Sequence, residues 1–282
     1  MSTLILLGMP HGAIDHYLYF HLKQQKMSSY RLIKFIFIYL LFSFVMAGLW
    51  ISFPIICIVG LIALTWAHWG EGDMIFERSR GHNVTWLFAL WRGSLPMILP
   101  VVLYAADYQR VLEAGVRAVN TSKDLSAFNW LIHPMTPVTI VSFMLILAGL
   151  NWFFICKDRT VSRSQQFRWF GEDIFLVALF LLLPPLVSIG IYFSLWHARR
   201  HILVTCKELG PPVWKGKSVQ WKKFYHWAAP FTIAGILLMC LIPIIYQNRE
   251  NLLMHLVGCY LITLWSFTWP HAMICRLLNK KY

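Results

Sequence analysis

The chain has 282 residues, of which 58% are hydrophobic, 16% aromatic and only 13% charged, and its formal net charge is +13. Soluble domains carry roughly a quarter charged residues, so this composition excludes an ordinary soluble domain and indicates lipid as the solvent. The basic residues gather in short loops and form no polar stripe with interleaved aromatic residues, which argues against nucleic acid as a partner. The sequence therefore predicts an all-α, polytopic transmembrane helix bundle.

The apolar stretches predict about eight spans in a single integral membrane domain covering residues 1–282. Most approach the ~20 residues that a helix needs to cross a bilayer core. They lie roughly at residues 3–22, 30–48, 51–69, 84–104, 136–156, 172–202, 224–247 and 251–277. Arg92, Gly93 and Pro96 lie inside the fourth stretch and Pro100 follows, so we expect that helix to be broken or kinked. The polar stretch after it is expected to hold a short amphipathic helix at residues 106–119.

Three basic loops, at residues 23–31, 157–170 and 199–223, are expected to face the cytoplasm, because Lys and Arg favour that side of a membrane. The last two are separated by a single predicted span, which would place them on opposite sides. Either one helix is re-entrant or miscounted, or one basic loop faces outward. The predicted location is the cell membrane (inner or plasma), crossed several times.

Ionisable side chains inside a span are costly, so each is a candidate functional residue. In the first stretch, His11 and Asp15 lie four residues apart and share one face of a helix. In the third, His68 is followed by Glu71 and Asp73, and these side chains could bind a metal or accept hydrogen bonds from its ligands. The alternatives are a frayed, hydrated helix start for His11 and a polar helix end for the residues after His68.

The most specific pattern lies at the end of the stretch that begins at Glu172. His197 and His201, spaced i, i+4, can direct two imidazoles at one metal ion, whereas an interfacial basic cluster with the neighbouring arginines is the alternative. His271, after Pro270 in the last stretch, could be a fifth ligand, a donor to a ligand or a substrate contact. A single hydrogen bond to another helix would also explain it.

The remaining histidines carry no predicted metal role. His21, His82, His133, His226 and His255 are expected at the membrane interface, and His16 is left without a role. The six cysteines form no C-x-x-C pair and are expected to be small core residues. A site made mainly of imidazoles suits iron, copper or zinc better than magnesium or calcium.

Taken together, these motifs resemble the Brp/Blh family of bacterial and archaeal carotenoid-cleaving membrane proteins. The matching segments are Pro10–His16, His68–Asp73, Pro184–Leu186, Tyr192–His201 and Pro270–His271, and they follow the family's order along essentially the whole chain. Trp69 stands where the family more usually has Phe, which keeps a large aromatic residue in place.

The resemblance implies a β-carotene 15,15′-dioxygenase, which splits the central double bond with O₂ to give two molecules of retinal. It implies non-haem Fe(II) held by four histidines, His11, His68, His197 and His201. Asp15, Asp73 and Glu172, with His271, are implied as residues that support these ligands. A microbial rhodopsin that receives the retinal is the expected partner.

Three alternative functions would use the same histidines differently. A membrane di-iron desaturase or hydroxylase also uses histidine clusters, but it would carry repeated HxxxH and HxxHH boxes, and only one clear HxxxH is present here. A bis-His haem protein would need only two facing histidines. A non-enzymatic transporter or rhodopsin assembly factor would leave the histidines without metal.

Overall fold

The computed structural model describes residues 7–120, 124–245 and 252–282. Apart from one short antiparallel strand pair, the secondary structure in these ranges is helical, as the sequence predicts. The elements, in chain order, are α1 (Pro10–Ala13), α2 (Asp15–Leu22), α3 (Ser29–Ser52), α4 (Pro54–Ser79), α5 (Trp86–Ile98), α6 (Val101–Arg117), the 3₁₀-helix η2 (Ser126–Ile132), α7 (Thr136–Lys157), α8 (Arg163–Leu182), α9 (Pro185–Ile191), the π-helix η3 (Tyr192–Ala198), α10 (Arg199–Leu209), β1 (Trp214–Lys215), β2 (Ser218–Val219), α11 (Trp221–Ile245) and α12 (Leu252–Asn279).

The number of candidate membrane spans in the described ranges is smaller than predicted. Four helices, α3, α4, α7 and α12, are long and apolar enough to cross a membrane, and the bent pair α5 and α6 makes at most a fifth. The prediction of about eight spans is therefore not confirmed. Two of the predicted spans are interrupted: the described part of residues 3–22, which begins at residue 7, contains the short helices α1 and α2, and residues 172–202 are divided among α8, α9, η3 and α10.

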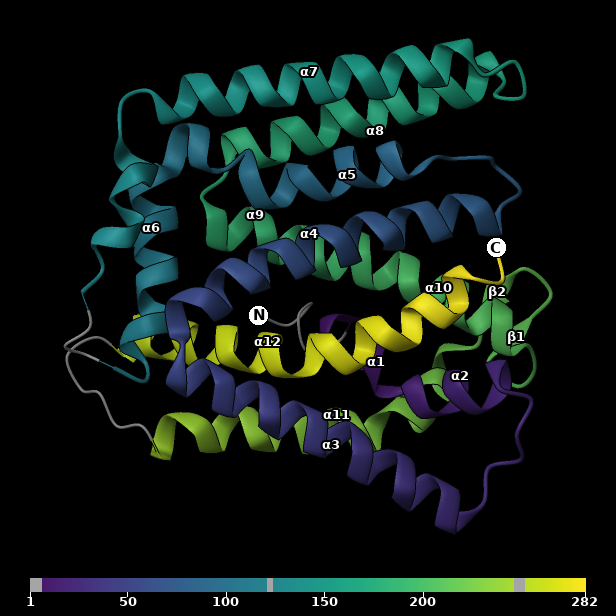
Figure 1. Ribbon diagram of the computed structural model, residues 1–282. Coiled ribbons are helices and arrows are strands. Elements are labelled where there is room, and N and C mark those ends of the chain that lie inside the picture. Colours follow the sequence, from purple (N-terminus) through teal and green to yellow (C-terminus); the bar gives the residue numbers. More distant parts are fainter. Residues whose placement is uncertain (1–6, 121–123, 246–251) are drawn as a thin grey trace.

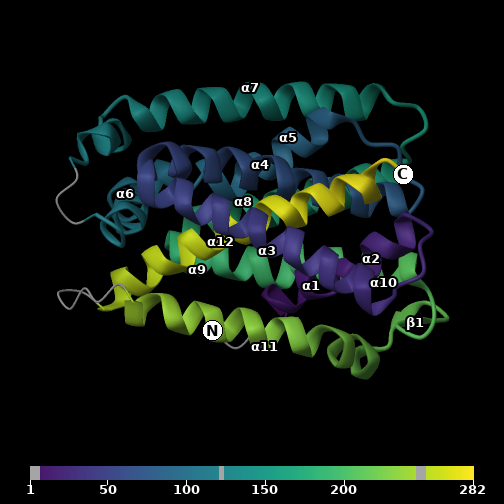
Figure 2. The same cartoon turned by 60° about the horizontal axis from the view of Figure 1, so that its bottom comes forward.

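Helices α3 and α7 present apolar side chains outward. Only 11% of the most apolar part of α3 and 28% of that of α7 is buried. Their outward residues include Phe37 and Phe44 on α3, and Leu145 and Phe153 on α7. Such surfaces are stable in hydrocarbon because each helix satisfies its own backbone hydrogen bonds. Figures 1 and 2 place α7 at one edge of the bundle and α11 at the opposite edge, with α4 and α12 between them.

The conflict between the two basic loops is resolved by a reversal of the chain inside the stretch 172–202. Helix α8 ends at Leu182, and Leu183 and Pro184 adopt extended conformations before α9 starts. The residue before a proline disfavours the helical conformation, which explains the break. Figure 1 shows α9, η3 and α10 running back antiparallel to α8, so the loops at 158–162 and 210–220 lie at the same end of the molecule. The predicted single span was a miscount.

The fourth predicted helix is broken, as expected: α5 ends at Ile98, α6 begins after Pro100, and the backbone leaves the helical conformation at Tyr104. Pro96 is inside α5, and α6 leaves α5 at 66° and runs across the end of the long helices (Figure 1). The amphipathic helix predicted at residues 106–119 is the later part of α6.

Glycines bring α4 and α5 into backbone contact. A Cβ added to Gly70 would lie 2.0 Å from the carbonyl oxygen of Ala89, and one added to Gly93 would lie 2.1 Å from the carbonyl oxygen of Trp66. Small residues permit this close approach between membrane helices. The contact fixes α4, which carries His68, against α5.

Substituting Gly70→Ala should therefore destabilise the protein, because two backbones must separate. Overpacking typically costs about 1–3 kcal/mol, and a clash with a carbonyl oxygen belongs at the upper end. Thermal unfolding of detergent-purified protein, followed by loss of the monodisperse size-exclusion peak, measures the effect. Gly149→Ala on α7 is the control, since no atom lies within 4 Å of its added Cβ. Equal transition temperatures for the two variants would contradict the proposed helix contact.

Candidate metal centre

Five histidines from separate parts of the chain converge in the interior of the described structure. His11 lies on α1, His68 on α4, His197 on η3, His201 on α10 and His271 on α12, and all are buried. The ring centroids of His68 and His197 are 4.9 Å apart, and those of His11 and His201 are 5.5 Å apart. The structure thus brings together all four histidines that the family resemblance implies as ligands.

Local breaks in the helices present these side chains. Pro10 occupies the first turn of α1, which ends at Ala13. His197 lies in the π-helix η3, whose wider turn changes the direction of the side chains relative to a regular α-helix. The rings of His197 and His201 are nearly parallel, at 13°, with centroids 6.4 Å apart. The i, i+4 spacing does place both imidazoles in one cluster, through a π-helical turn.

The arrangement of nitrogen atoms suits a metal ion. His11, His68 and His197 each offer a nitrogen atom, and these atoms lie within 4.8 Å of one another. The Nε2 atom of His197 is buried and has no hydrogen-bond partner in the described structure. His11 Nδ1 bonds the carbonyl of Gly8, so its Nε2 is free for a metal. Buried polar atoms nearly always have a partner, and a first-row transition metal would supply one to a set of imidazoles.

Asp15 binds the imidazole of His271, which is not one of the four histidines implied as ligands. His271 Nδ1 lies 2.9 and 3.0 Å from the two carboxylate oxygens of Asp15. The hydroxyl of Tyr39 donates to the same carboxylate at 3.3 Å. Asp15, His201 and His271 form a second group whose potential ligand atoms lie within 4.8 Å of one another.

A small cavity of about 10 Å³ adjoins the cluster, large enough for one water-sized molecule. His68, Gly72, His201 and Cys275 are among its lining residues. A Cβ on Gly72 would approach His197 Cε1 to 3.0 Å, so a glycine is needed there to leave room for the ring.

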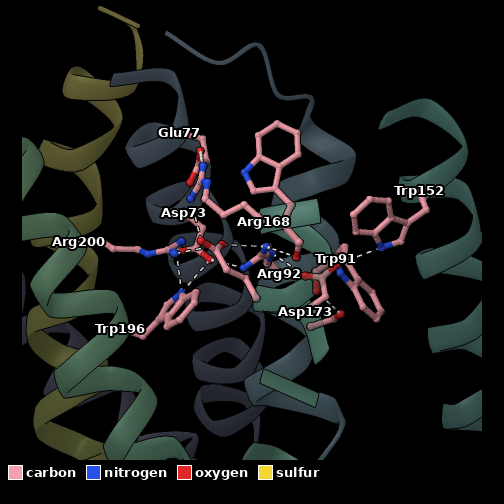
Figure 3. Close-up of polar contacts among 12 residues, drawn as sticks. Asp73, Glu77, Trp91, Arg92, Trp152, Arg168, Asp173, Trp196 and Arg200 are labelled. Atoms are coloured by element: carbon pink, nitrogen blue, oxygen red, sulfur yellow. Dashed lines mark hydrogen bonds and ion pairs between the residues drawn. The ribbon is translucent and has the colours of Figure 1, made fainter. Parts of the chain in front are cut away.

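A buried ionic network lies beside the cluster and connects the helices that carry it (Figure 3). Arg200, at the start of α10, donates to Asp73 of α4 at 3.0 Å. The indole N–H of Trp196 donates to the same carboxylate at 3.2 Å. Since α4 also carries His68, these contacts hold α4 against the segment that carries His197.

Arg92 is at the centre of this network and is completely buried. Its guanidinium pairs with Asp173 at 2.8 Å, with Glu172 at 3.1 Å and with Asp73 at 3.8 Å, and so joins α5 to α8 and α4. Figure 3 shows Arg92 between Asp73 and Asp173, with Trp91 and Trp152 beside Asp173. A buried charge is tolerated only when it is paired, and Arg92 meets this condition three times over.

The outer part of the network approaches the basic end of the molecule. Arg168 binds Glu172 at 2.8 Å and also Glu77. His82, in the turn after α4, lies 4.0 Å from Glu77. Burial lowers the pKa of His82 more than the Glu77 carboxylate raises it. His82 is therefore expected to be uncharged at neutral pH and to add no positive charge.

Comparison with known proteins fixes the family. A model of the β-carotene 15,15′-dioxygenase family matches residues 2–279. The chain belongs to this family. It is 24% identical to a probable β-carotene 15,15′-dioxygenase, Blh, of Halobacterium salinarum, over 99% of this chain and 83% of the relative. It is also 24% identical to a β-carotene 15,15′-dioxygenase of uncultured marine bacterium 66A03, over 74% of this chain and 69% of the relative. No solved structure matches the chain.

The family assignment makes the protein an oxidoreductase and confirms the identification made from the motifs. Two of the supporting roles implied for this family do not match the contacts. Asp73 and Glu172 were expected to accept hydrogen bonds from ligand imidazoles, but both bind arginines instead. Glu172 also lies in the middle of α8, not at the start of a helix. The reversal after α8 brings Arg200 next to both carboxylates.

Two histidines outside the cluster are more buried than their patterns suggest. His16 packs against Tyr17 and Phe231, with ring centroids 4.2 and 4.6 Å away. His255 was expected at the interface, but it is buried on α12 near the Sγ atom of Cys259. His255 lies one turn inside α12, a helix that packs against α6.

The sequence patterns did not predict three side chains at the cluster. Cys275 has its Sγ 3.5 Å from His271 Nε2, and the hydroxyl of Thr205 lies 3.2 Å from His201 Nε2. Both follow a clustered histidine by four residues, so helical spacing could have found them. The third is Tyr39, for which no local pattern exists, because it reaches Asp15 from another helix.

Proposed function

We propose that this protein cleaves β-carotene at its central 15,15′ double bond with O₂, giving two molecules of retinal. The observation that supports this proposal is the convergence of buried imidazoles inside a chain whose family match covers residues 2–279. In the net reaction, the central C=C bond and the O–O bond break and two C=O bonds form. One C40 substrate and one O₂ thus account for all atoms of two C20 aldehydes.

The proposed cofactor is non-haem Fe(II), held by His11, His68, His197 and His201. When bound, it would supply a site for O₂ and the electrons that activate it. The protein's contribution is to offer neutral nitrogen atoms in a dry interior. Two features support this. The carbonyl oxygen of Gly8 bonds Nδ1 of His11, which leaves the other ring nitrogen for a metal, and Nε2 of His197 has no hydrogen-bond partner in the described structure. Arg200 lies beside the cluster, but Asp73 and Glu172 balance its charge, which limits its repulsion of a cation.

Aromatic side chains next to the cluster suit a conjugated hydrocarbon. Trp69 and Phe193 are stacked at 27° with centroids 5.8 Å apart, and Phe193 lies 5.4 Å from His11. Tyr192 packs on Trp69 at 5.1 Å. Flat apolar faces of this kind would hold the middle of a polyene against the histidines and exclude water. Because the substrate dissolves only in the bilayer, an enzyme within the membrane meets it directly.

The proposed setting is a multi-pass protein of the cell membrane, with the basic end facing the cytoplasm. The loops at 23–28, 158–162 and 210–220 lie at one end of the bundle, and Lys and Arg favour the cytoplasmic side (Figure 1). Retinal released into the bilayer would be available to a microbial rhodopsin.

Coexpression in a β-carotene-producing bacterium tests the function. The orange cells should become pale, and extracts should contain retinal in a ratio of two per carotene lost. Chelation of iron in isolated membranes should stop the conversion, and added Fe(II) should restore it. Unchanged carotene in cells whose membranes contain the protein would refute the proposal.

A further inference from the structure

His271 lies as close to His11, His68 and His201 as members of the cluster lie to one another. Its ring centroid is 4.8 Å from that of His11, 5.0 Å from that of His68 and 5.1 Å from that of His201. These separations are shorter than the 6.4 Å between His197 and His201. A single structural hydrogen bond to another helix does not require contact with three imidazoles.

The two nitrogen atoms of His271 have different surroundings. Nδ1 is held by Asp15 at 2.9 Å, and Tyr39 fixes that carboxylate from the other side. If Nδ1–H donates to Asp15, the neutral ring has its lone pair on Nε2. The hydrogen-bond partner of Nε2 in the described structure is the Sγ of Cys275 at 3.5 Å, and a thiol is only a weak donor.

A carboxylate that binds the outer nitrogen of a histidine is the usual support of a metal-bound imidazole, because it fixes the tautomer and raises the basicity of the other nitrogen. The approach of α1 also accommodates this ring. A Cβ on Gly12 would lie 3.3 Å from His271 Nδ1, a distance at which one of the two would have to move.

We propose that His271 is a fifth imidazole ligand of the metal centre, bound through Nε2 and oriented by Asp15 and Tyr39. This inference rests on the proposed iron site and extends it from four imidazoles to five. It assigns Asp15 and Tyr39 as positioning residues.

The test uses purified, iron-loaded full-length protein, with iron affinity measured by competition against a chelator. His271→Gln keeps an amide donor for Asp15 but has no imidazole, and we expect it to bind iron more than ~100-fold more weakly, since loss of a ligand should cost more than loss of the partner behind it. Asp15→Asn should weaken binding on the order of 10- to 100-fold, as is typical for such partners. His255→Gln is the matched control, because His255 is equally buried on the same helix and lies outside the cluster.

A spectroscopic measurement separates a ligand from a structural residue. His271→Gly should accept free imidazole in the space it opens, and pulsed EPR of its iron–nitric oxide adduct should show coupling to ¹⁵N-labelled imidazole. The same label should give no coupling in His255→Gly. Unchanged iron affinity in His271→Gln, or no ¹⁵N coupling in folded His271→Gly, would overturn the inference.

Two further outcomes are distinguishable. If the wild-type protein bound no iron, the proposed function would fail with this inference. If it bound two iron ions per chain and His271→Gln lost one of them, His271 would belong to a separate site with Asp15 and His201, and the five-imidazole centre would be overturned.

Discussion

Replacing His197 or His201 by alanine should abolish carotene cleavage while leaving the protein in the membrane. Loss of a partner behind a ligand costs about 10- to 100-fold in metal affinity or activity, so loss of a ligand should cost more than ~100-fold. Both residues are buried and face the other imidazoles at 5.5 Å from His11. His197 Nε2 has no hydrogen-bond partner in the described structure, and His201 Nε2 loses the 3.2 Å contact with the hydroxyl of Thr205.

Retinal formation by isolated membranes, normalised to the amount of protein by immunoblot, measures this effect, and iron content of the purified variants accompanies it. His255→Ala removes a buried imidazole of the same size outside the cluster and should retain the activity. A His197→Ala protein that still forms retinal at more than a tenth of the wild-type rate would contradict its role as a ligand.

Long apolar helices were the most predictable part of the fold. The stretches 30–48, 136–156 and 251–277 correspond to α3, α7 and α12, because a lipid-facing helix must be apolar along its whole length. Hydropathy could not show where an apolar stretch reverses direction. Residues 172–202 have the length and composition of one span, yet the chain turns at Pro184. The paired prolines, Pro184 and Pro185, were the available signal.

The cluster was predictable to the extent that ionisable residues stand out in apolar sequence. His11, His68, His197, His201 and His271 were all identified on that basis, and the structure brings them together. Their hydrogen-bond partners were not predictable, because a carboxylate's partner depends on which helices become neighbours. Asp73 lies five residues from His68, but the chain reversal brings Arg200 to it. Arg92 had no apparent role until its helix was placed among three carboxylates.

That placement makes Arg92→Met one of the most damaging single substitutions outside the cluster. The side chain is fully buried, and its removal leaves Asp173, Glu172 and Asp73 with less positive charge beside them. Breaking a buried ion pair from one side costs roughly 3–5 kcal/mol, since the remaining charge is uncompensated. We expect a lower unfolding temperature in detergent, measured by intrinsic tryptophan fluorescence.

Arg110→Met is the matched control, because Arg110 also makes a 2.8 Å ion pair, with Asp107, but both side chains are exposed. Exposed pairs contribute roughly 0–1 kcal/mol, so its transition should barely change. Adding Asp173→Asn to Arg92→Met removes one of the uncompensated charges and should recover part of the lost stability. Equal destabilisation by Arg92→Met and Arg110→Met would show that the network does not hold α4, α5 and α8 together. If it does hold them, Arg92→Met should also lower the iron content, because Asp73 connects Arg92 to Arg200 beside the histidine cluster.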